Sequence, residues 1–199
     1  MEPAPRTPLP TTLEMRVVRE RLRPDFFDAL YATDPDPWGF ETSEYEATKY
    51  AATIAALEGR HFKNTLEIGC SIGVLTQLLE DHTDGLVAID VSEAALERAR
   101  ARNPDVNLQR REIPEDYPDG DFDLVVASEV LYYLDPPALR DTIDRFTGTL
   151  LAVHWRGPTE RYPFTGDEVH EQLKARFGAP AYSAWTDKYA LDRWDACGS

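Results

Sequence analysis

Residues 65–90 read TLEIGCSIGVLTQLLEDHTDGLVAID, and this stretch decides the fold. A short apolar run meets a turn that holds Gly69 and Gly73, an amphipathic run follows, and a second apolar run ends at Asp90. Glycines at such a turn allow positive φ angles and let a ligand lie against the main chain. Asp90 falls about 20 residues beyond the turn, where a carboxylate binds the ribose hydroxyls of a nucleotide. This order predicts a nucleotide-type site; the alternative is that the glycines only permit tight packing while Asp90 caps the next helix.

Short strands and helices alternate along the rest of the chain, which is typical of a parallel sheet with crossover helices. Two strand-like runs close the chain, AYSAWTD at 181–187 and KYALDRWDA at 188–196, and they leave no room for a helix between them. We therefore expect them to pair antiparallel. The predicted fold is α/β, with a mostly parallel seven-stranded sheet, an antiparallel C-terminal hairpin and helices on both faces. Strands are predicted at 65–69, 86–90, 106–112, 122–128 and 149–155, and helices near 72–82, 92–102, 136–147 and 166–177.

The N-terminal part is predicted as a tail, two helices and a loop. Four prolines in the first dozen residues and few apolar side chains favour a flexible tail over 1–23. The proline-rich loop 34–40 then separates a short helix from a longer one over 43–58. The predicted organisation is one domain over 24–199, with N-terminal helices and a lid over 24–63 and the nucleotide-binding core over 64–199.

The composition limits the classes of function. The 199 residues hold 36 acidic and 21 basic side chains, a net charge of −15, which disfavours a nucleic-acid groove and suits a neutral or cationic small molecule. The two cysteines cannot build a disulfide framework, and no Cys/His cluster indicates a metal site. No apolar run approaches the roughly 20 residues that span a membrane, and the N-terminus lacks the pattern of a secretory signal. We expect a cytoplasmic protein without a nucleic-acid or membrane partner.

The glycine turn resembles the first motif of the class I S-adenosylmethionine-dependent methyltransferases. In that family an acid precedes the glycines, as Glu67 precedes Gly69 and Gly73 here, and Cys70 stands where a middle glycine is common. The resemblance implies a Rossmann-like fold and S-adenosylmethionine as the cofactor. It also implies that the turn meets the methionine part of the cofactor and that Asp90 holds the ribose.

Further cofactor contacts are implied by the same resemblance. Val91 would lie against the adenine, and Glu112 and Ile113, after the third strand, match the positions that flank the adenine ring. Trp38 lies on a loop that could cover the cofactor as a lid; the alternative is a hydrophobic anchor for the N-terminal helices. The expected cofactor-binding set is Trp38, Glu67, Gly69, Cys70, Gly73, Asp90, Val91, Glu112, Ile113 and Ser128.

A narrower resemblance connects the chain to the nodulation protein S family of N-methyltransferases. It is carried by DPW at 36–38, ETSEYEATKY at 41–50, LEIGC at 66–70 and SEVLYYL at 128–134, within about 34–145. The family methylates the free amine of a deacetylated glucosamine in chitooligosaccharide signals. The chain departs from it before the fifth strand, where Phe-Thr-Gly-Thr replaces the usual Leu-x-Pro-Gly-Gly turn, so the resemblance does not identify the acceptor.

Four residues are candidates for the reaction itself. Glu129, Tyr132 and Tyr133 follow the fourth strand at the carboxyl edge, where open α/β sheets bind ligands. Glu129 could hold a cationic amine or act as a base, and each tyrosine could shape the pocket or simply pack in the core. His154, at the end of the fifth strand, could be a general base or a structural histidine. The other histidines, His61, His82 and His170, are predicted at the surface.

The leading hypothesis is a methyltransferase that acts on a small polar acceptor, preferably the amine of an amino sugar or a related metabolite. An O-methyltransferase of a secondary metabolite would use the same cofactor residues. An NAD-dependent oxidoreductase is a remote alternative, because Asp90 suits any adenosine ribose, but the G-x-G-x-x-G pattern is missing. A noncatalytic cofactor-binding partner subunit is the third alternative. Nothing in the sequence indicates the oligomeric state.

Overall fold

The computed structural model describes residues 20–158 and 162–197. Most of the predicted tail lies outside the described residues. Its last part, 20–23, does not behave as a free tail, because the Leu22 amide donates a hydrogen bond to the Tyr133 carbonyl at 2.9 Å. Arg21 adds ion pairs of 2.9 Å to Glu112 and Glu115. The tail prediction is therefore wrong for 20–23, because these residues are held across the sheet edge by contacts with distant segments.

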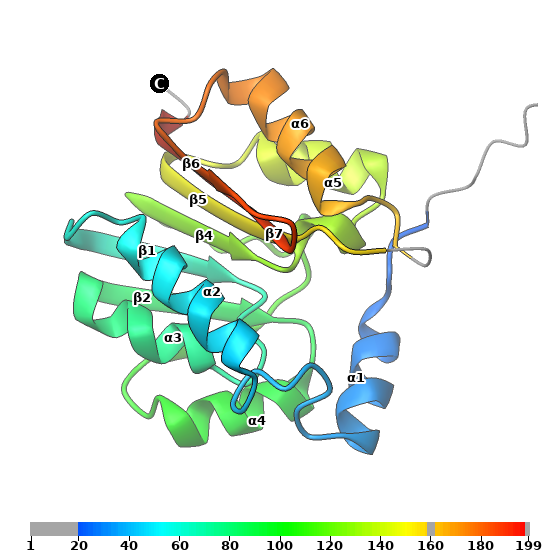
Figure 1. The fold of residues 1–199 in the computed structure, drawn as a ribbon. Helices are drawn as coiled ribbons and strands as arrows, with labels where there is room; N and C mark the ends of the chain where they lie inside the picture. Colours follow the sequence, from blue (N-terminus) through cyan, green and yellow to red (C-terminus); the bar gives the residue numbers. More distant parts are fainter. Residues whose placement is uncertain (1–19, 159–161, 198–199) are drawn as a thin grey trace, which may run out of the picture.

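One seven-stranded sheet organises the chain in the order β3-β2-β1-β4-β5-β7-β6 (Figure 1). The first five strands run parallel, and β7 pairs antiparallel with both β5 and β6. This arrangement confirms the predicted fold class. The strands are β1 (Phe62–Ile68), β2 (Thr83–Asp90), β3 (Asn107–Arg110), β4 (Leu124–Ser128), β5 (Gly148–Trp155), β6 (Tyr182–Trp185) and β7 (Tyr189–Cys197).

Helices cover both faces of the sheet (Figure 1). Several begin at side-chain caps: Asp135 accepts from the Ala138 amide at 2.9 Å, and Thr165 with Glu168 forms a capping box. The helices are α1 (Pro24–Thr33), α2 (Glu44–Ala55), α3 (Val74–Leu79), α4 (Glu93–Arg102), α5 (Pro136–Ile143) and α6 (Gly166–Phe177), with 3₁₀ turns η1 (Glu80–His82) and η2 (Leu131–Tyr133).

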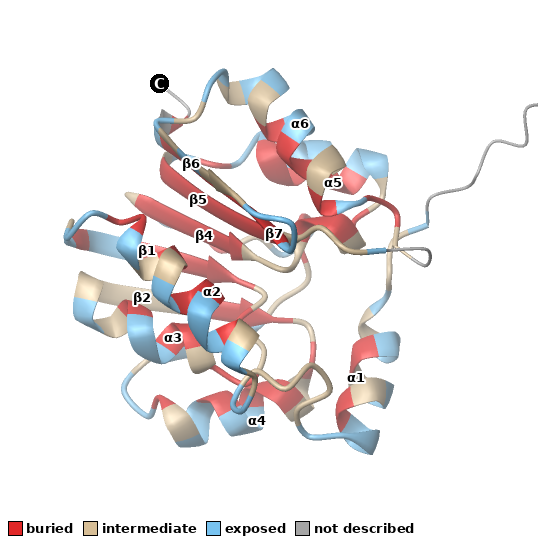
Figure 2. Cartoon of the chain, in the orientation of Figure 1, coloured by how far each residue is buried: buried red, intermediate tan, exposed pale blue. Residues whose placement is uncertain are grey.

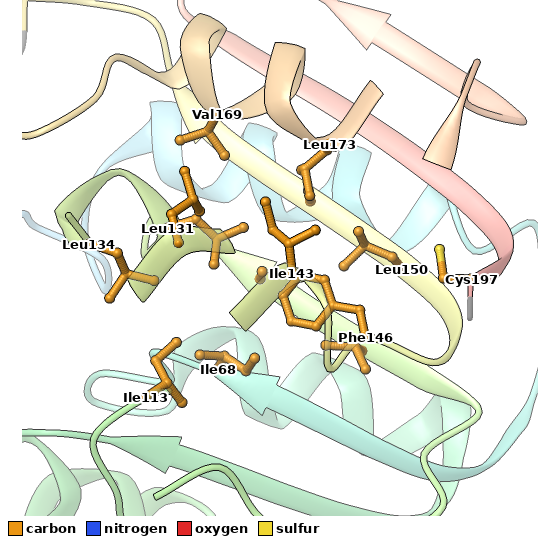
Figure 3. Close-up of a cluster of buried hydrophobic side chains, with 14 of the residues drawn as sticks. Ile68, Ile113, Leu131, Leu134, Ile143, Phe146, Leu150, Val169, Leu173 and Cys197 are labelled. Atoms are coloured by element: carbon orange, nitrogen blue, oxygen red, sulfur yellow. The ribbon is translucent and has the colours of Figure 1, made fainter. Parts of the chain in front are cut away.

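The central strands are largely buried (Figure 2), and each face carries its own apolar cluster, as expected for parallel strands that are covered on both sides. Leu150 and Ala152 of β5 face α5 and α6, in the cluster that also holds Ile143 and Leu173 (Figure 3). The alternate residues of the same strand pack on the opposite face with residues of α2 and α3. The period of two along β5 therefore decides which helix layer each side chain meets.

Three helix predictions are too long, and the first of them, the predicted helix 43–58, ends at Ala55. The predicted helix 72–82 is α-helical only from Val74, because Gly73 takes a left-handed conformation at its N-cap, and it tightens to 3₁₀ geometry at Glu80. The predicted helix 136–147 ends at Ile143. Across the part of the chain that the structure describes, no helix is both long and apolar enough to cross a membrane.

Candidate active site

A cavity of about 550 Å³ opens at the carboxyl ends of β1, β2, β4 and β5. Residues from 20–50, which include α1 and the first part of α2, supply its other wall. A cavity of this size at this edge is where open α/β sheets hold small molecules. Of the fourteen predicted site residues, Cys70, Val91, Ile113 and Ser128 line the cavity.

The glycine turn after β1 meets the cavity through only one of its two glycines. Gly69 lines the cavity with φ of 76°, and a Cβ there would approach that of Val130 to 2.9 Å. Gly73 does not line the cavity. A Cβ at this position would lie 2.3 Å from the side-chain nitrogen Nδ2 of Asn103 and 3.1 Å from Ala99 of α4. Gly73 is thus required for the close approach of α3 to α4, which was the packing alternative for this residue.

Asp90 ends β2 with its carboxylate held by main-chain donors. Its Oδ2 accepts from the Ser71 amide and its Oδ1 from the Ser92 amide, both at 2.9 Å. Burial raises the pKa of Asp90, and these hydrogen bonds counteract the rise. A carboxylate has about four acceptor positions, so each oxygen keeps capacity for one more donor from the cavity. This is the arrangement that a pair of vicinal hydroxyls needs.

Glu67 is the second buried carboxyl on the cofactor side of the cavity. The Thr76 hydroxyl donates to its Oε2 at 2.6 Å. Burial raises the pKa of Glu67 to about 7, the Thr76 hydrogen bond opposes the rise, and the charge of Asp90 adds to it. Glu67 therefore changes charge near neutral pH and would respond to a cation placed beside it.

The cover of the cavity is aromatic. Trp38 lines the cavity, stacks on Phe40 at 5.6 Å between ring centroids and meets Tyr31 edge-on at 5.7 Å. It also packs in a cluster with Ile72. Trp38 thus covers the cavity and anchors the N-terminal segment at once. The Tyr31 hydroxyl, bonded to that of Ser71, ties α1 to the glycine turn.

Glu112 lines the cavity but is engaged in an ion pair. Its carboxylate lies 2.9 Å from the Arg21 guanidinium, with 38% of its side chain exposed. This pair fastens residues 20–23 beside the expected adenine position. Sequence reasoning assigned Glu112 to the cofactor and gave no partner from the predicted tail.

Glu129 follows β4 in a left-handed conformation, with φ of 56°. Its Oε1 accepts from the Lys49 ammonium at 2.6 Å, and its Oε2 accepts from the Tyr132 hydroxyl at 2.5 Å and from the Trp155 amide at 2.9 Å. Burial raises the pKa of Tyr132 well above its ordinary value, and the charge of Glu129 adds to the rise. Glu129 is therefore held by three donors, and Tyr132 stays protonated.

Tyr133 lies beside Tyr132 on the cavity wall. The two rings meet edge-on at 4.5 Å, and Tyr162 packs against both. Burial also raises the pKa of Tyr133 well above its ordinary value. The predicted tyrosines thus form an aromatic wall of protonated phenols and supply no ready base.

Two charged residues of α2, Glu46 and Lys49, line the cavity and were missed by sequence reasoning. Lys49 is only 1% exposed and Glu46 only 6%. Their signal was present: both fall on the same helix face as the apolar Tyr50 and the buried Thr53, three or four residues apart. A charge pair on a face that must be buried indicates a site.

His154 is not at the cavity, which corrects the prediction of a ligand-edge base. It shares the parity of Leu150 and Ala152 along β5, so its side chain turns to the α6 face and is fully buried. His170, predicted at the surface, is also fully buried, because it faces the sheet from α6. His154 Nδ1 lies 3.2 Å from His170 Nε2, and His170 Nδ1 lies 2.7 Å from Asp192 Oδ2.

The hydrogen bonds fix the protons on these histidines. The Leu131 amide donates to His154 Nε2 at 3.3 Å, so His154 carries its proton on Nδ1 and donates to His170. His170 then donates from Nδ1 to Asp192. Burial lowers the pKa of His154 well below its ordinary value, and the positive charge of Lys49 adds to the fall. The chain of bonds ends on the main chain of η2, directly before Tyr132.

Among residues 20–158 and 162–197, no group of three or more His, Cys, Asp or Glu side chains is placed to hold a metal ion. The two cysteines, Cys70 and Cys197, are free and buried. The polar groups of the cavity wall are carboxylates, phenols, the Lys49 ammonium, the guanidinium groups of Arg21 and Arg111, the Cys70 thiol and the hydroxyls of Ser71 and Ser128.

The chain is similar in sequence to a known protein family. The model of the Nodulation protein S (NodS) family matches residues 26–153. Nodulation protein S of Azorhizobium caulinodans is 31% identical over 127 residues, which cover 62% of this chain and 58% of the relative. Nodulation protein S of Bradyrhizobium diazoefficiens is 29% identical over 155 residues, which cover 73% of this chain and 68% of the relative. The chain thus spans about three fifths to two thirds of the length of these relatives.

A solved structure gives the same result in three dimensions. The N-methyltransferase NodS from Bradyrhizobium japonicum WM9, in complex with S-adenosyl-L-homocysteine, superposes with a TM-score of 0.75 at 25% identity, over 86% of this chain and 97% of that one. The sheet order with its antiparallel last strands is that of the class I methyltransferase fold. The narrower resemblance found in the sequence is confirmed: this chain belongs to the nodulation protein S family.

Proposed function

We propose that the protein is an S-adenosylmethionine-dependent methyltransferase that methylates the amine nitrogen of a small polar acceptor. One observation carries the proposal: a single cavity joins a ribose-type carboxylate, Asp90, to a second group of buried charges around Glu129. Family membership and the S-adenosyl-L-homocysteine complex of a relative support the same cofactor. The amine of an amino sugar or a related metabolite is the preferred acceptor, on the strength of the family resemblance.

The residues of the cofactor side fit an adenosyl sulfonium. Asp90 has free acceptor positions for the ribose hydroxyls, and Gly69 presents main chain without a Cβ. Val91 and Ile113 offer apolar surface for the adenine. Glu67, with its pKa near 7, would complement a cationic group of the methionine part. When bound, the cofactor supplies an electrophilic methyl group on sulfur.

On the acceptor side, the chain has to hold the nucleophile and free its lone pair. An ammonium group has no lone pair, so a base must take its proton, and a carboxylate can do this. The wall of the cavity on the acceptor side contains Glu129, which is held in place by a hydrogen bond from Tyr132. The rings of Tyr133 and Tyr162 pack against each other in the same wall. His154 supports the wall from behind through the Leu131 amide and would act as a positioning residue.

The proposal is tested in two steps. Calorimetric titration is expected to show binding of S-adenosyl-L-homocysteine and none of NAD; the reverse result would contradict the cofactor assignment. Methyl transfer from labelled S-adenosylmethionine is then measured with a panel of amino sugars, simple amines and phenols. We expect the label on nitrogen. Label on oxygen alone would establish the O-methyltransferase alternative, and cofactor binding without transfer to any acceptor would favour a noncatalytic partner.

A further inference from the structure

Three charged side chains meet at the acceptor side of the cavity: Glu46, Lys49 and Glu129. The Lys49 ammonium lies 2.6 Å from Glu129 Oε1, 3.0 Å from Glu46 Oε1 and 2.8 Å from Glu46 Oε2. Lys49 is 1% exposed, and the side chains of Glu46 and Glu129 are 8% and 13% exposed. All three line the cavity. When ionised, this group holds two negative charges and one positive charge in a place with little water.

The two carboxylates differ in how far their acceptor positions are filled. Glu129 accepts from Lys49, from the Tyr132 hydroxyl and from the Trp155 amide. Glu46 has Lys49 as its one donor among the described residues, and its buried Oε2 has no hydrogen-bond partner of good geometry there. A carboxylate without enough donors is costly to bury. Glu46 therefore keeps unused acceptor capacity beside the cavity.

We propose that Glu46 binds the ammonium group of the methyl acceptor, so that the cavity selects acceptors carrying one positive charge. This inference rests on the proposed function and narrows its substrate class to primary or secondary amines that are protonated in solution. A single added cation would balance the second carboxylate, whereas a neutral hydroxyl or an anionic acceptor would leave the charge uncompensated. Glu46 would thus set specificity, while Lys49 and Glu129 hold it in place.

The aromatic walls suit the same ligand. Tyr45 lies with its ring 5.2 Å from the Lys49 ammonium and lines the cavity with Tyr132 and Tyr162. Aromatic faces attract cations and accept apolar carbon. An organic ammonium ion brings both a charge for the carboxylate and hydrocarbon for the rings. A compact amine is therefore matched in charge and in surface by this part of the cavity.

Glu46 can also take the proton that the amine must lose. The step is R–NH₃⁺ plus Glu46 carboxylate giving R–NH₂ plus Glu46 carboxylic acid, in which the N–H bond breaks, its electron pair stays on nitrogen and an O–H bond forms. Burial raises the pKa of Glu46, the positive charge of Lys49 opposes the rise, and the charges of Glu129 and Asp36 add to it. The carboxylates would favour the charged form of the bound amine, whereas burial and the like charge of Lys49 would lower its pKa and so reduce the pKa difference between the amine and Glu46.

The test uses the full chain saturated with S-adenosyl-L-homocysteine. Glucosamine, benzylamine and n-hexylamine are titrated calorimetrically, each beside its N-acetyl derivative, which keeps the parent carbon chain or ring, adds an acetyl group on the nitrogen and carries no charge. We expect at least one amine to bind, its N-acetyl derivative to bind at least about tenfold more weakly, and Glu46→Gln to weaken the amine by about tenfold or more. Glu44→Gln is the matched control, because Glu44 is exposed on the same helix; it should bind amine like the unaltered protein.

Three results would overturn the inference: N-acetyl derivatives that bind as well as the amines, unchanged amine affinity in Glu46→Gln, or no binding of any amine in the panel. Glu46→Gln must first bind S-adenosyl-L-homocysteine normally, which shows that it is folded. If it does not, Glu46→Asp replaces it and is expected to keep the preference for amines at lower affinity; loss of the preference with intact cofactor binding would also contradict the proposal. Failure of the proposed function is distinct, since it appears as absent cofactor binding or as label on oxygen.

Discussion

At the scale of single residues, the buried carboxylates of the cavity differ in the donors that surround them. Among the described residues, two main-chain amides hold Asp90 and one hydroxyl holds Glu67, whereas Glu129 has three donors and Glu46 has Lys49 as its one donor. These partners decide which carboxylate is fixed, which titrates near neutrality and which is free to meet a ligand. Two of the four give predictions that need no knowledge of the acceptor.

Asp90→Asn is expected to weaken S-adenosyl-L-homocysteine binding by about tenfold to a hundredfold. The change keeps the size of the side chain but removes the negative charge and one acceptor from the ribose position, and a hydrogen bond to a charged group contributes about 1.5–3 kcal/mol. Calorimetric titration measures the loss. Asp81→Asn, at an exposed position beyond α3, is the control and should bind normally. Equal affinities of the two variants would contradict the role of Asp90.

Glu67→Gln is expected to stabilise the ligand-free protein at pH 8. The pKa of Glu67 is about 7 in the folded chain against 4.5 as its ordinary value, so the folded state holds a proton that the unfolded state releases between these pH values. Stability contributed by this group therefore falls as pH rises from 4.5 to 7, by roughly 3 kcal/mol. Glutamine removes this loss while still accepting from Thr76.

Urea unfolding of both proteins at pH 8 and pH 5 checks this prediction. The advantage of Glu67→Gln should be roughly 2–3 kcal/mol at pH 8 and should shrink at pH 5, where the folded carboxyl is protonated. An advantage that is the same at both pH values, or a less stable variant at pH 8, would show that Glu67 is not a carboxyl of raised pKa.

At the scale of elements, strand parity and helix faces explain where sequence reasoning succeeded and where it did not. The ends of β1, β2 and β4 were predictable, because glycine or polar residues follow apolar runs there. The prediction for His154 was wrong because it used only the position near the end of β5. It did not consider that side chains alternate between the two faces of a strand, which directs His154 toward α6. Glu46 and Lys49 were missed because α2 was judged by its apolar spacing alone, without asking which charges shared that face.

The His154–His170–Asp192 chain links α6, β5 and β7 to the η2 turn, and His154→Leu tests it. At pH 8 the variant should be less stable by about 2–4 kcal/mol, because the buried Leu131 amide and the His170 ring lose their partner. The pKa of His154 is far below 6.5 in the folded chain, so below pH 6.5 its imidazole is protonated in the unfolded chain and stays neutral in the folded chain. Stability thus falls as pH drops through that region, and the variant should show a shallower fall.

Thermal unfolding between pH 5 and pH 8 measures both effects. His61→Leu is the control, because His61 is exposed and its removal should change stability far less than the removal of the buried His154. The turnover of His154→Leu should fall while its affinity for S-adenosyl-L-homocysteine stays near normal, since η2 carries Tyr132 but no cofactor residue. An unchanged slope together with normal turnover would show that the chain does not position η2.

At the scale of the whole molecule, the sheet order and the family were predictable and the acceptor side was not. A strand, glycine turn, helix and acid specify a local unit, and the alternation after it specifies the sheet. The acceptor side forms only when residues 20–50 fold back over the edge of the sheet, which brings Lys49 to Glu129 across 80 residues of chain. Such long-range pairing leaves little trace in local sequence patterns.

The family match ends at residue 153, so α6 and the hairpin β6–β7 lie beyond it. These elements contain His170 and Asp192, and the Trp185 indole donates hydrogen bonds to the Asp192 carboxylate, the last acceptor of the histidine chain. The hydrogen-bonded chain from Asp192 through His170 to His154 therefore lies outside the region matched by the family model.

The most direct test of the whole account is a crystal structure with S-adenosyl-L-homocysteine and the tightest-binding amine of the panel. The ribose hydroxyls are predicted within hydrogen-bond distance of the Asp90 carboxylate, and the amine nitrogen within hydrogen-bond distance of Glu46. A nucleoside bound outside the cavity, or an amine seated away from Glu46 with Lys49 still bridging both carboxylates, would contradict it.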